Sequence, residues 1–63
     1  MLRNGFSFRV VSNGIVGELD GLTRPGIWSV CFYENGSMIH RYDVYEQTII
    51  NNLKAGLYEE VTR

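Results

Sequence analysis

Residues 27–42, IWSVCFYENGSMIHRY, contain the clearest structural pattern in this chain of 63 residues. Two runs rich in apolar, aromatic and β-branched residues flank the dipeptide Asn35-Gly36. Asn-Gly is the strongest short-range hairpin signal, because a type I′ turn needs a positive φ at both central residues and these residue types tolerate it best. We therefore predict strands at 27–33 and 37–42, joined by a tight turn.

The first of these strands is apolar on both faces. Side chains alternate along a strand, so Trp28, Val30 and Phe32 share one face. The opposite face holds three further residues, Ile27, Cys31 and Tyr33. A strand with this pattern is usually central in its sheet and covered on both sides.

The strand at 37–42 alternates in the same way. We expect Met38, His40 and Tyr42 on one face. Ile39 and Arg41 then lie on the other face.

A second hairpin is expected in the N-terminal half. Residues 6–11 alternate with the period of a half-buried strand, Asn13-Gly14 supplies a turn, and residues 15–19 return. Gly17 inside the returning strand indicates either a bulge or a close approach of backbone. Residues 20–26 are expected to form a loop that ends in a Pro-Gly pair, which suits the central positions of a type II turn.

The pattern changes to that of a helix after Tyr42. Asp43 as N-cap and Glu46 three residues later have the spacing of a capping box, and the helix is predicted over 44–55. Gly56 suits the left-handed position that ends a helix. Residues 57–61 then form either a short last strand or a frayed tail.

Length and composition limit the chain to a single domain, residues 1–63. A hydrophobic content of 44% argues against disorder. With one cysteine and one histidine the chain cannot form an internal disulfide or a four-ligand zinc site of the usual kind, so neither metal nor cofactor is expected. The N-terminus lacks the apolar segment of a signal peptide, which leads us to expect a soluble cytoplasmic protein.

The order of the expected elements resembles that of the small SH3-like β-barrels. The resemblance rests on residues 15–19, IVGEL, followed by residues 28–32, WSVCF, and the turn 34–37, ENGS. It covers about residues 6–61 and implies four or five antiparallel strands rolled towards a barrel, to which the sequence pattern adds a helix near the C-terminus. The long helical segment differs from the single 3₁₀ turn of those barrels, so an open four-stranded antiparallel sheet with one packed helix is the alternative. Diffuse motifs of this kind carry no functional residues over.

Catalytic residues are not expected. Cys31 could act as a nucleophile only with a base in hydrogen-bond reach, and His40 is the one candidate. A free cysteine in an apolar strand is far more often a small core residue. We interpret His40 itself as a polar residue on a strand face.

Tyrosine and arginine are the strongest candidates for a binding surface, since both are enriched in binding hot spots. The set consists of Arg9, Arg24, Tyr33, Arg41, Tyr42, Tyr45 and Tyr58. Charged residues are scattered and the formal charge is −1, which argues against a nucleic-acid footprint.

We therefore expect a non-catalytic protein-binding module, a small regulator or inhibitor of the kind that phages and mobile elements encode. The alternative is a nucleic-acid-binding barrel that uses arginines and tyrosines. The chain is also expected to form a homodimer, because a single helix covers only one side of an apolar strand and a paired copy would cover a sheet edge.

Overall fold

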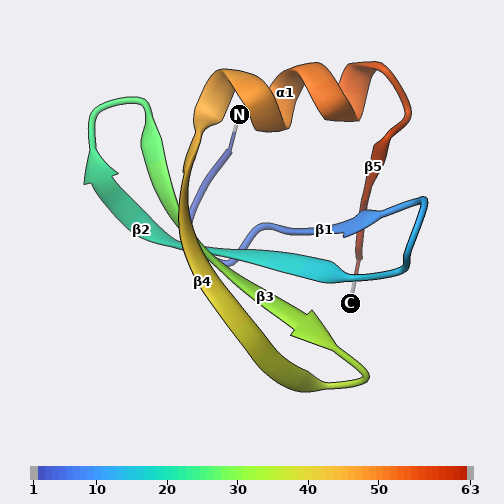
Figure 1. Ribbon diagram of the computed structural model, residues 1–63. Coiled ribbons are helices and arrows are strands. Elements are labelled where there is room, and N and C mark those ends of the chain that lie inside the picture. Colours follow the sequence, from blue (N-terminus) through green and yellow to red (C-terminus); the bar gives the residue numbers. More distant parts are fainter. Residues whose placement is uncertain (1, 63) are drawn as a thin grey trace.

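The computed structural model describes residues 2–62 and contains a five-stranded antiparallel sheet and one helix (Figure 1). The elements follow in the order β1 (Ser7–Val10), β2 (Val16–Arg24), β3 (Ile27–Glu34), β4 (Ser37–Tyr45), α1 (Glu46–Lys54) and β5 (Tyr58–Glu60). The strand order is β4-β3-β2-β1-β5, so β4 and β5 are the two edges of an open sheet. The predicted class, mainly β with one helix near the C-terminus, is confirmed. Among residues 2–62 there is no helix long and apolar enough to cross a membrane.

The core lies between α1 and one face of the sheet, which we call the inner face. It consists of Phe8, Leu19, Trp28, Val30 and Ile49. Phe32 is only half-buried and packs against this cluster. The predicted common face of Trp28, Val30 and Phe32 is therefore confirmed.

The turn between β3 and β4 has the predicted geometry. Asn35 has a φ of 52° and Gly36 a φ of 82°, and only these two residues separate the strands. Positive φ at both central positions is the signature of a type I′ turn, whose twist matches that of the flanking strands.

The turn between β1 and β2 is wider than predicted. Five residues, 11–15, separate the strands, and only Gly14 has a positive φ. The amide of Gly14 donates to the carbonyl of Val10, and the amide of Ile15 donates to Oδ1 of Asn13. The Asn13 side chain thus stabilises the turn through its amide oxygen, and a two-residue type I′ turn is not formed.

Residues 20–24 were predicted as loop but continue strand β2. Their polar character reflects exposure along the end of the strand and not a loop. The register against β3 shifts between Leu19 and Leu22, where Gly21 has a φ of 90°. An irregularity of this type bends a strand without ending it. The loop is reduced to Pro25-Gly26, and the φ of 80° at Gly26 agrees with the predicted type II turn.

A register shift in β4 separates Met38 from His40, contrary to the prediction that they share a face. Met38 pairs with Tyr33 but His40 pairs with Phe32, so Ile39 is an extra residue in β4. Paired residues share a face, and successive residues of β3 lie on opposite faces. His40 and Tyr42 therefore lie on the inner face and Met38 on the other.

The helix begins at Glu46, and the prediction that Asp43 caps it is wrong. Asp43 is still paired with Ser29 in the sheet, and its Oδ1 accepts a hydrogen bond of 3.0 Å from the Thr23 hydroxyl. Tyr45 occupies the N-cap position without a side-chain cap. Pairing with β3 thus extends the strand across the capping sequence.

The helix ends as predicted. Gly56 has a φ of 78°, and its amide donates to the carbonyl of Leu53. The amide of Leu57 donates to the carbonyl of Asn52, which completes a Schellman motif. The chain then forms β5, which pairs with β1, so the tail at 57–61 contains a strand.

Candidate functional site

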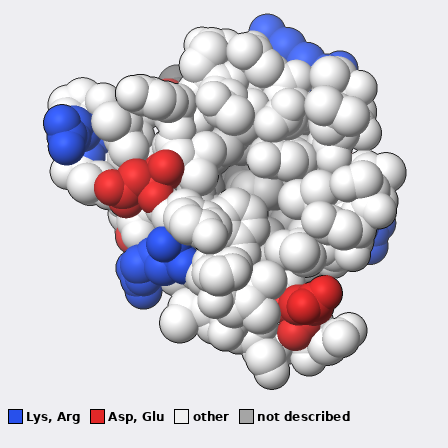
Figure 2. Space-filling view, viewed as in Figure 1, with Lys and Arg blue, Asp and Glu red and all other residues white. Residues whose placement is uncertain are grey.

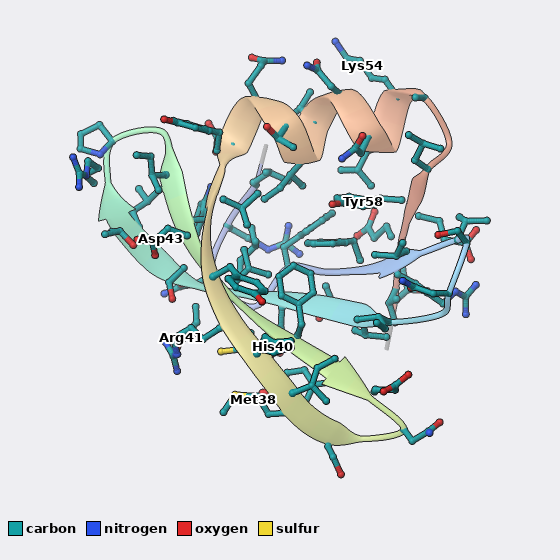
Figure 3. All side chains as sticks on the ribbon, viewed as in Figure 1. Met38, His40, Arg41, Asp43, Lys54 and Tyr58 are labelled. Carbon is teal, nitrogen blue, oxygen red and sulfur yellow. The ribbon has the colours of Figure 1, made fainter. Side chains whose placement is uncertain are left out.

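A row of aromatic side chains crosses the inner face and ends outside the core. Tyr58 stacks on Phe8 with a centroid distance of 4.4 Å, and Phe8 meets Phe32 edge-on at 6.1 Å. Phe32 lies 6.0 Å from Tyr42, whose ring stacks on His40 at 5.2 Å. We call these five residues the aromatic row (Figure 3 labels Tyr58 and His40, which lie near its two ends).

Gly17 makes the row continuous across β2. In the sheet Gly17 lies between Phe8 and Phe32 as the partner of both. A Cβ atom on Gly17 would lie 2.5 Å from Cζ of Phe8. The missing side chain therefore lets the Phe8 ring extend over β2 towards Phe32. The predicted bulge or close backbone approach at Gly17 is replaced by the close approach of a side-chain ring.

Exposure rises along the row from the core to the edge strand. Phe8 is fully buried, Tyr58 and Phe32 are half-buried, and Tyr42 is 54% exposed. His40 is also exposed. In Figure 2 the centre of this side of the molecule is uncharged, and the charged side chains lie towards its rim. The exposed end, formed by Phe32, His40 and Tyr42, is the candidate site.

The seven residues predicted to bind a partner are distributed over the molecule. Tyr42 and Tyr58 belong to the aromatic row. Tyr45 and Arg24 lie near the turn at Pro25-Gly26, where both flank Ile27 in the sheet. The remaining three lie on the opposite, outer face and are Arg9, Tyr33 and Arg41.

Two of the outer-face arginines form ion pairs within the chain. Arg9 pairs with Glu59 on β5. Arg41 Nη1 donates to Asp20 Oδ2 at 2.8 Å and to the Ser29 hydroxyl at 3.2 Å. The hydrogen bond that Arg41 donates to Asp20 raises the pKa of Arg41 further above its ordinary value, so this guanidinium remains protonated throughout the usual pH range.

Among the described residues no second layer covers the outer face of β3, contrary to the expectation for a strand that is apolar on both faces. Cys31 on this face is buried, its Sγ lies 3.9 Å from Oδ2 of Asp20, and it is paired with Arg41. Since His40 projects from the inner face, it cannot serve Cys31 as a base.

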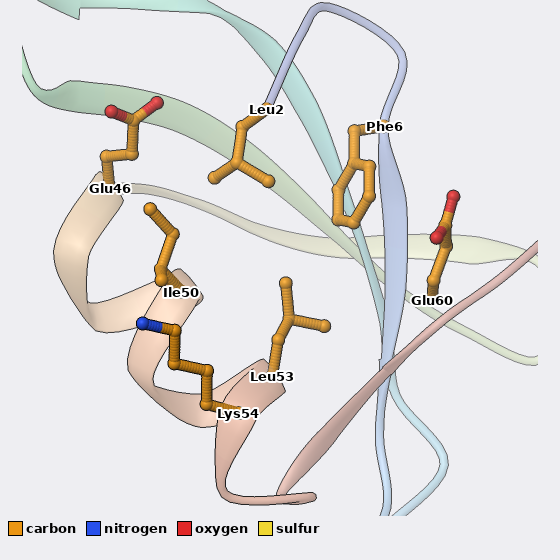
Figure 4. Close-up of a pocket in the computed structure, with 7 residues that line it drawn as sticks. All are labelled: Leu2, Phe6, Glu46, Ile50, Leu53, Lys54 and Glu60. Carbon is orange, nitrogen blue, oxygen red and sulfur yellow. The ribbon is translucent and has the colours of Figure 1, made fainter.

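A separate pocket of about 410 Å³ lies between α1, the N-terminal segment and β5 (Figure 4). Four apolar side chains face one another in it, and they are Leu2, Phe6, Ile50 and Leu53. Glu46, Lys54 and Glu60 lie around them. Glu46 accepts a hydrogen bond of 2.9 Å from Nε1 of Trp28, so it supports the core at this site.

No cluster of metal-ligating residues occurs within the described residues 2–62. Comparisons with protein-family models, with curated proteins and with solved structures give no match. The resemblance of residues 6–61 to SH3-like barrels therefore stays a prediction.

Proposed function

We propose that this protein is a non-catalytic binding module that regulates or inhibits a partner protein by covering part of its surface. The observation that carries the proposal is the exposed end of the aromatic row. Aromatic side chains that are held rigidly and surrounded by uncharged surface supply large contact area at a low entropic cost. The Tyr42 ring contacts the Phe32 ring and stacks on the His40 ring.

The arrangement of charge favours a protein over a nucleic acid as the partner. Binding to single strands combines stacking aromatics with cations along the same groove. Here Arg9 and Arg41 lie on the outer face in ion pairs, whereas Tyr42 lies on the inner face. A titration with single- and double-stranded DNA and RNA at two salt concentrations tests the alternative, and we expect no salt-dependent binding.

A homodimer belongs to the same proposal, with a second copy of the chain as a further partner. A cytoplasmic location and an origin in a phage or mobile element stay predictions.

The proposal is tested by affinity capture from the lysate of the native host, with two tyrosine variants compared. Tyr42→Ala removes an exposed ring of the row. Tyr33→Ala is the matched control, because Tyr33 lies on the neighbouring strand β3 and projects from the outer face. For a partner captured by the parent protein, we expect Tyr42→Ala to raise Kd by about thirtyfold, as a hot-spot residue does.

Tyr33→Ala should leave the affinity for that partner unchanged. Equal affinity of the parent and Tyr42→Ala, or a loss confined to Tyr33→Ala, would contradict the proposed site.

A further inference from the structure

Strand β4 is a long sheet edge with little protection against pairing. It contains nine residues, Ser37–Tyr45, and all except Val44 are exposed. Natural edges are usually protected by charged side chains, above all lysine, by proline, by bulges or by being short. β4 contains neither proline nor lysine, its charged residues Arg41 and Asp43 are of opposite sign, and its one bulge, at Ile39, lies near the turn. Figure 1 shows β4 along the margin of the sheet with no other segment in front of it.

The hydrogen-bonding pattern tells which residues of β4 present free backbone groups at this edge. The amide of Glu46, directly after β4, donates to the carbonyl of Gly26 at 2.9 Å. Backbone groups alternate in direction along an antiparallel strand. Those of Tyr42 and Val44 therefore face β3, and those of Arg41, Asp43 and Tyr45 face away from the sheet.

Only a few self-pairings satisfy this alternation. In an antiparallel pair about a two-fold axis, outward-facing residues must lie opposite outward-facing residues. An axis at Arg41 or at Asp43 places like charges directly opposite each other, which is destabilising. An axis at Tyr42 places Arg41 opposite the partner's Asp43, and this opposite-charge pair occurs twice.

We propose that two copies of the chain pair through β4 in antiparallel orientation, about a two-fold axis at Tyr42. The proposal rests on the homodimer included in the proposed function and names its interface. Arg41 and Asp43 each have polar atoms that their hydrogen bonds within the chain do not use. Arg41 uses Nη1 for Asp20 and Ser29, and Asp43 uses Oδ1 for Thr23. These hydrogen bonds direct both side chains across β3 towards β2, and they do not use Nε and Nη2 of Arg41 or Oδ2 of Asp43.

The pairing joins the two aromatic rows. Tyr42 lies opposite the partner's Tyr42 on the inner face, and His40 lies opposite the partner's Val44. The exposed ends of the two rows meet at the axis and form one surface, which is larger than either copy presents alone. Ile39 and Tyr45, both exposed in the single chain, also face each other across the interface.

The test uses two charge reversals that complement each other. In Arg41→Asp, and likewise in Asp43→Arg, like charges oppose each other across the axis, and we expect the dimer dissociation constant to rise by about tenfold or more. A mixture of the two variants restores both opposite-charge pairs. Native mass spectrometry should therefore show a heterodimer in the mixture and monomers in each separate sample.

Lys54→Glu is the control, because it changes the net charge by the same amount as Arg41→Asp but lies on the exposed end of α1. It should dimerise like the parent protein. Circular dichroism of each variant checks that the fold is retained. Because misfolding cannot be repaired by mixing two damaged chains, heterodimer formation by itself supports the register.

Amide exchange supplies an independent measurement on the unaltered chain. The amides of Arg41 and Asp43 should gain protection as protein concentration rises, whereas those of Tyr42 and Val44 should be protected at all concentrations. A parent protein that sediments at 7.2 kDa at every concentration would remove the homodimer altogether. A dimer whose two variants fail to pair when mixed would overturn the register alone.

Discussion

At the scale of single residues, Gly17 and Phe8 determine how the aromatic side chains are arranged. The Phe8 ring is fully buried and occupies the space that a side chain at position 17 would need. The φ of Gly17 is not in the left-handed region, so its importance is steric and not conformational. Any larger residue must displace a ring that contacts both Tyr58 and Phe32.

Gly17→Ala should therefore destabilise the protein by about 1–3 kcal/mol, the usual cost of overpacking a core. Urea unfolding measures the change. Phe8→Leu removes the outer part of the ring, and the double variant should lose less stability than the sum of the two single changes. The close contact between position 17 and the Phe8 ring would be refuted if the two stability losses were strictly additive. It would also be refuted if Gly17→Ala were as stable as the parent protein.

At the scale of elements, the two ends of α1 are determined by different interactions. The start is set by the sheet, because Asp43 remains paired with Ser29 and the Glu46 amide bonds to Gly26. The end is set locally by the Schellman motif at Gly56. Capping sequences are thus decisive at the C-terminus of this helix and not at its N-terminus.

Gly56→Ala should cost about 1–2 kcal/mol, because a Cβ atom is unfavourable in the left-handed region. Gly56→Asn should cost less, since asparagine tolerates that region. At concentrations at which the chain is monomeric, Asp43→Ala should change the free energy of unfolding by about 0.5 kcal/mol or less, because within one chain it removes only an exposed hydrogen bond to Thr23. Thermal unfolding compares the stability of the three variants. A larger loss of stability for Asp43→Ala than for Gly56→Ala would indicate that Asp43 caps the helix after all.

At the scale of the whole molecule, the fold is one sheet with a single helix packed on one face, and the core between them is small. A chain of this length buries only about 60% of the surface that its unfolded form exposes. Within residues 2–62 the helix covers one face, ion pairs and long polar side chains cover part of the other, and β4 remains an open edge. Association through that edge would stabilise the fold by mass action.

The midpoint of thermal unfolding should accordingly rise with protein concentration, because dimerisation stabilises only the folded chain. Calorimetry over about a hundredfold range of concentration measures the rise. The midpoint of Arg41→Asp should depend much less on concentration. A parent protein whose midpoint is the same at all concentrations would show that folding and association are not coupled.

The candidate site was predictable only in part. Tyr42 and Tyr58 were in the predicted binding set because tyrosine is enriched in binding surfaces. Phe8, Phe32 and His40 were not, since an apolar alternating strand marks its aromatics as core and a single histidine has no spacing to interpret. The alignment of Gly17 between Phe8 and Phe32 depends on strand register, which a single sequence does not specify.

The sequence by itself determined the features that depend on neighbouring residues. The type I′ turn at Asn35-Gly36, the turn at Pro25-Gly26 and the helix end at Gly56 follow from the φ angles that these residues adopt. Only the tertiary structure decided the extent of β2, the bulge at Ile39 and the start of α1. These features depend on hydrogen bonds between separate strands, and cooperative pairing across a sheet outweighs local propensities of about 1 kcal/mol.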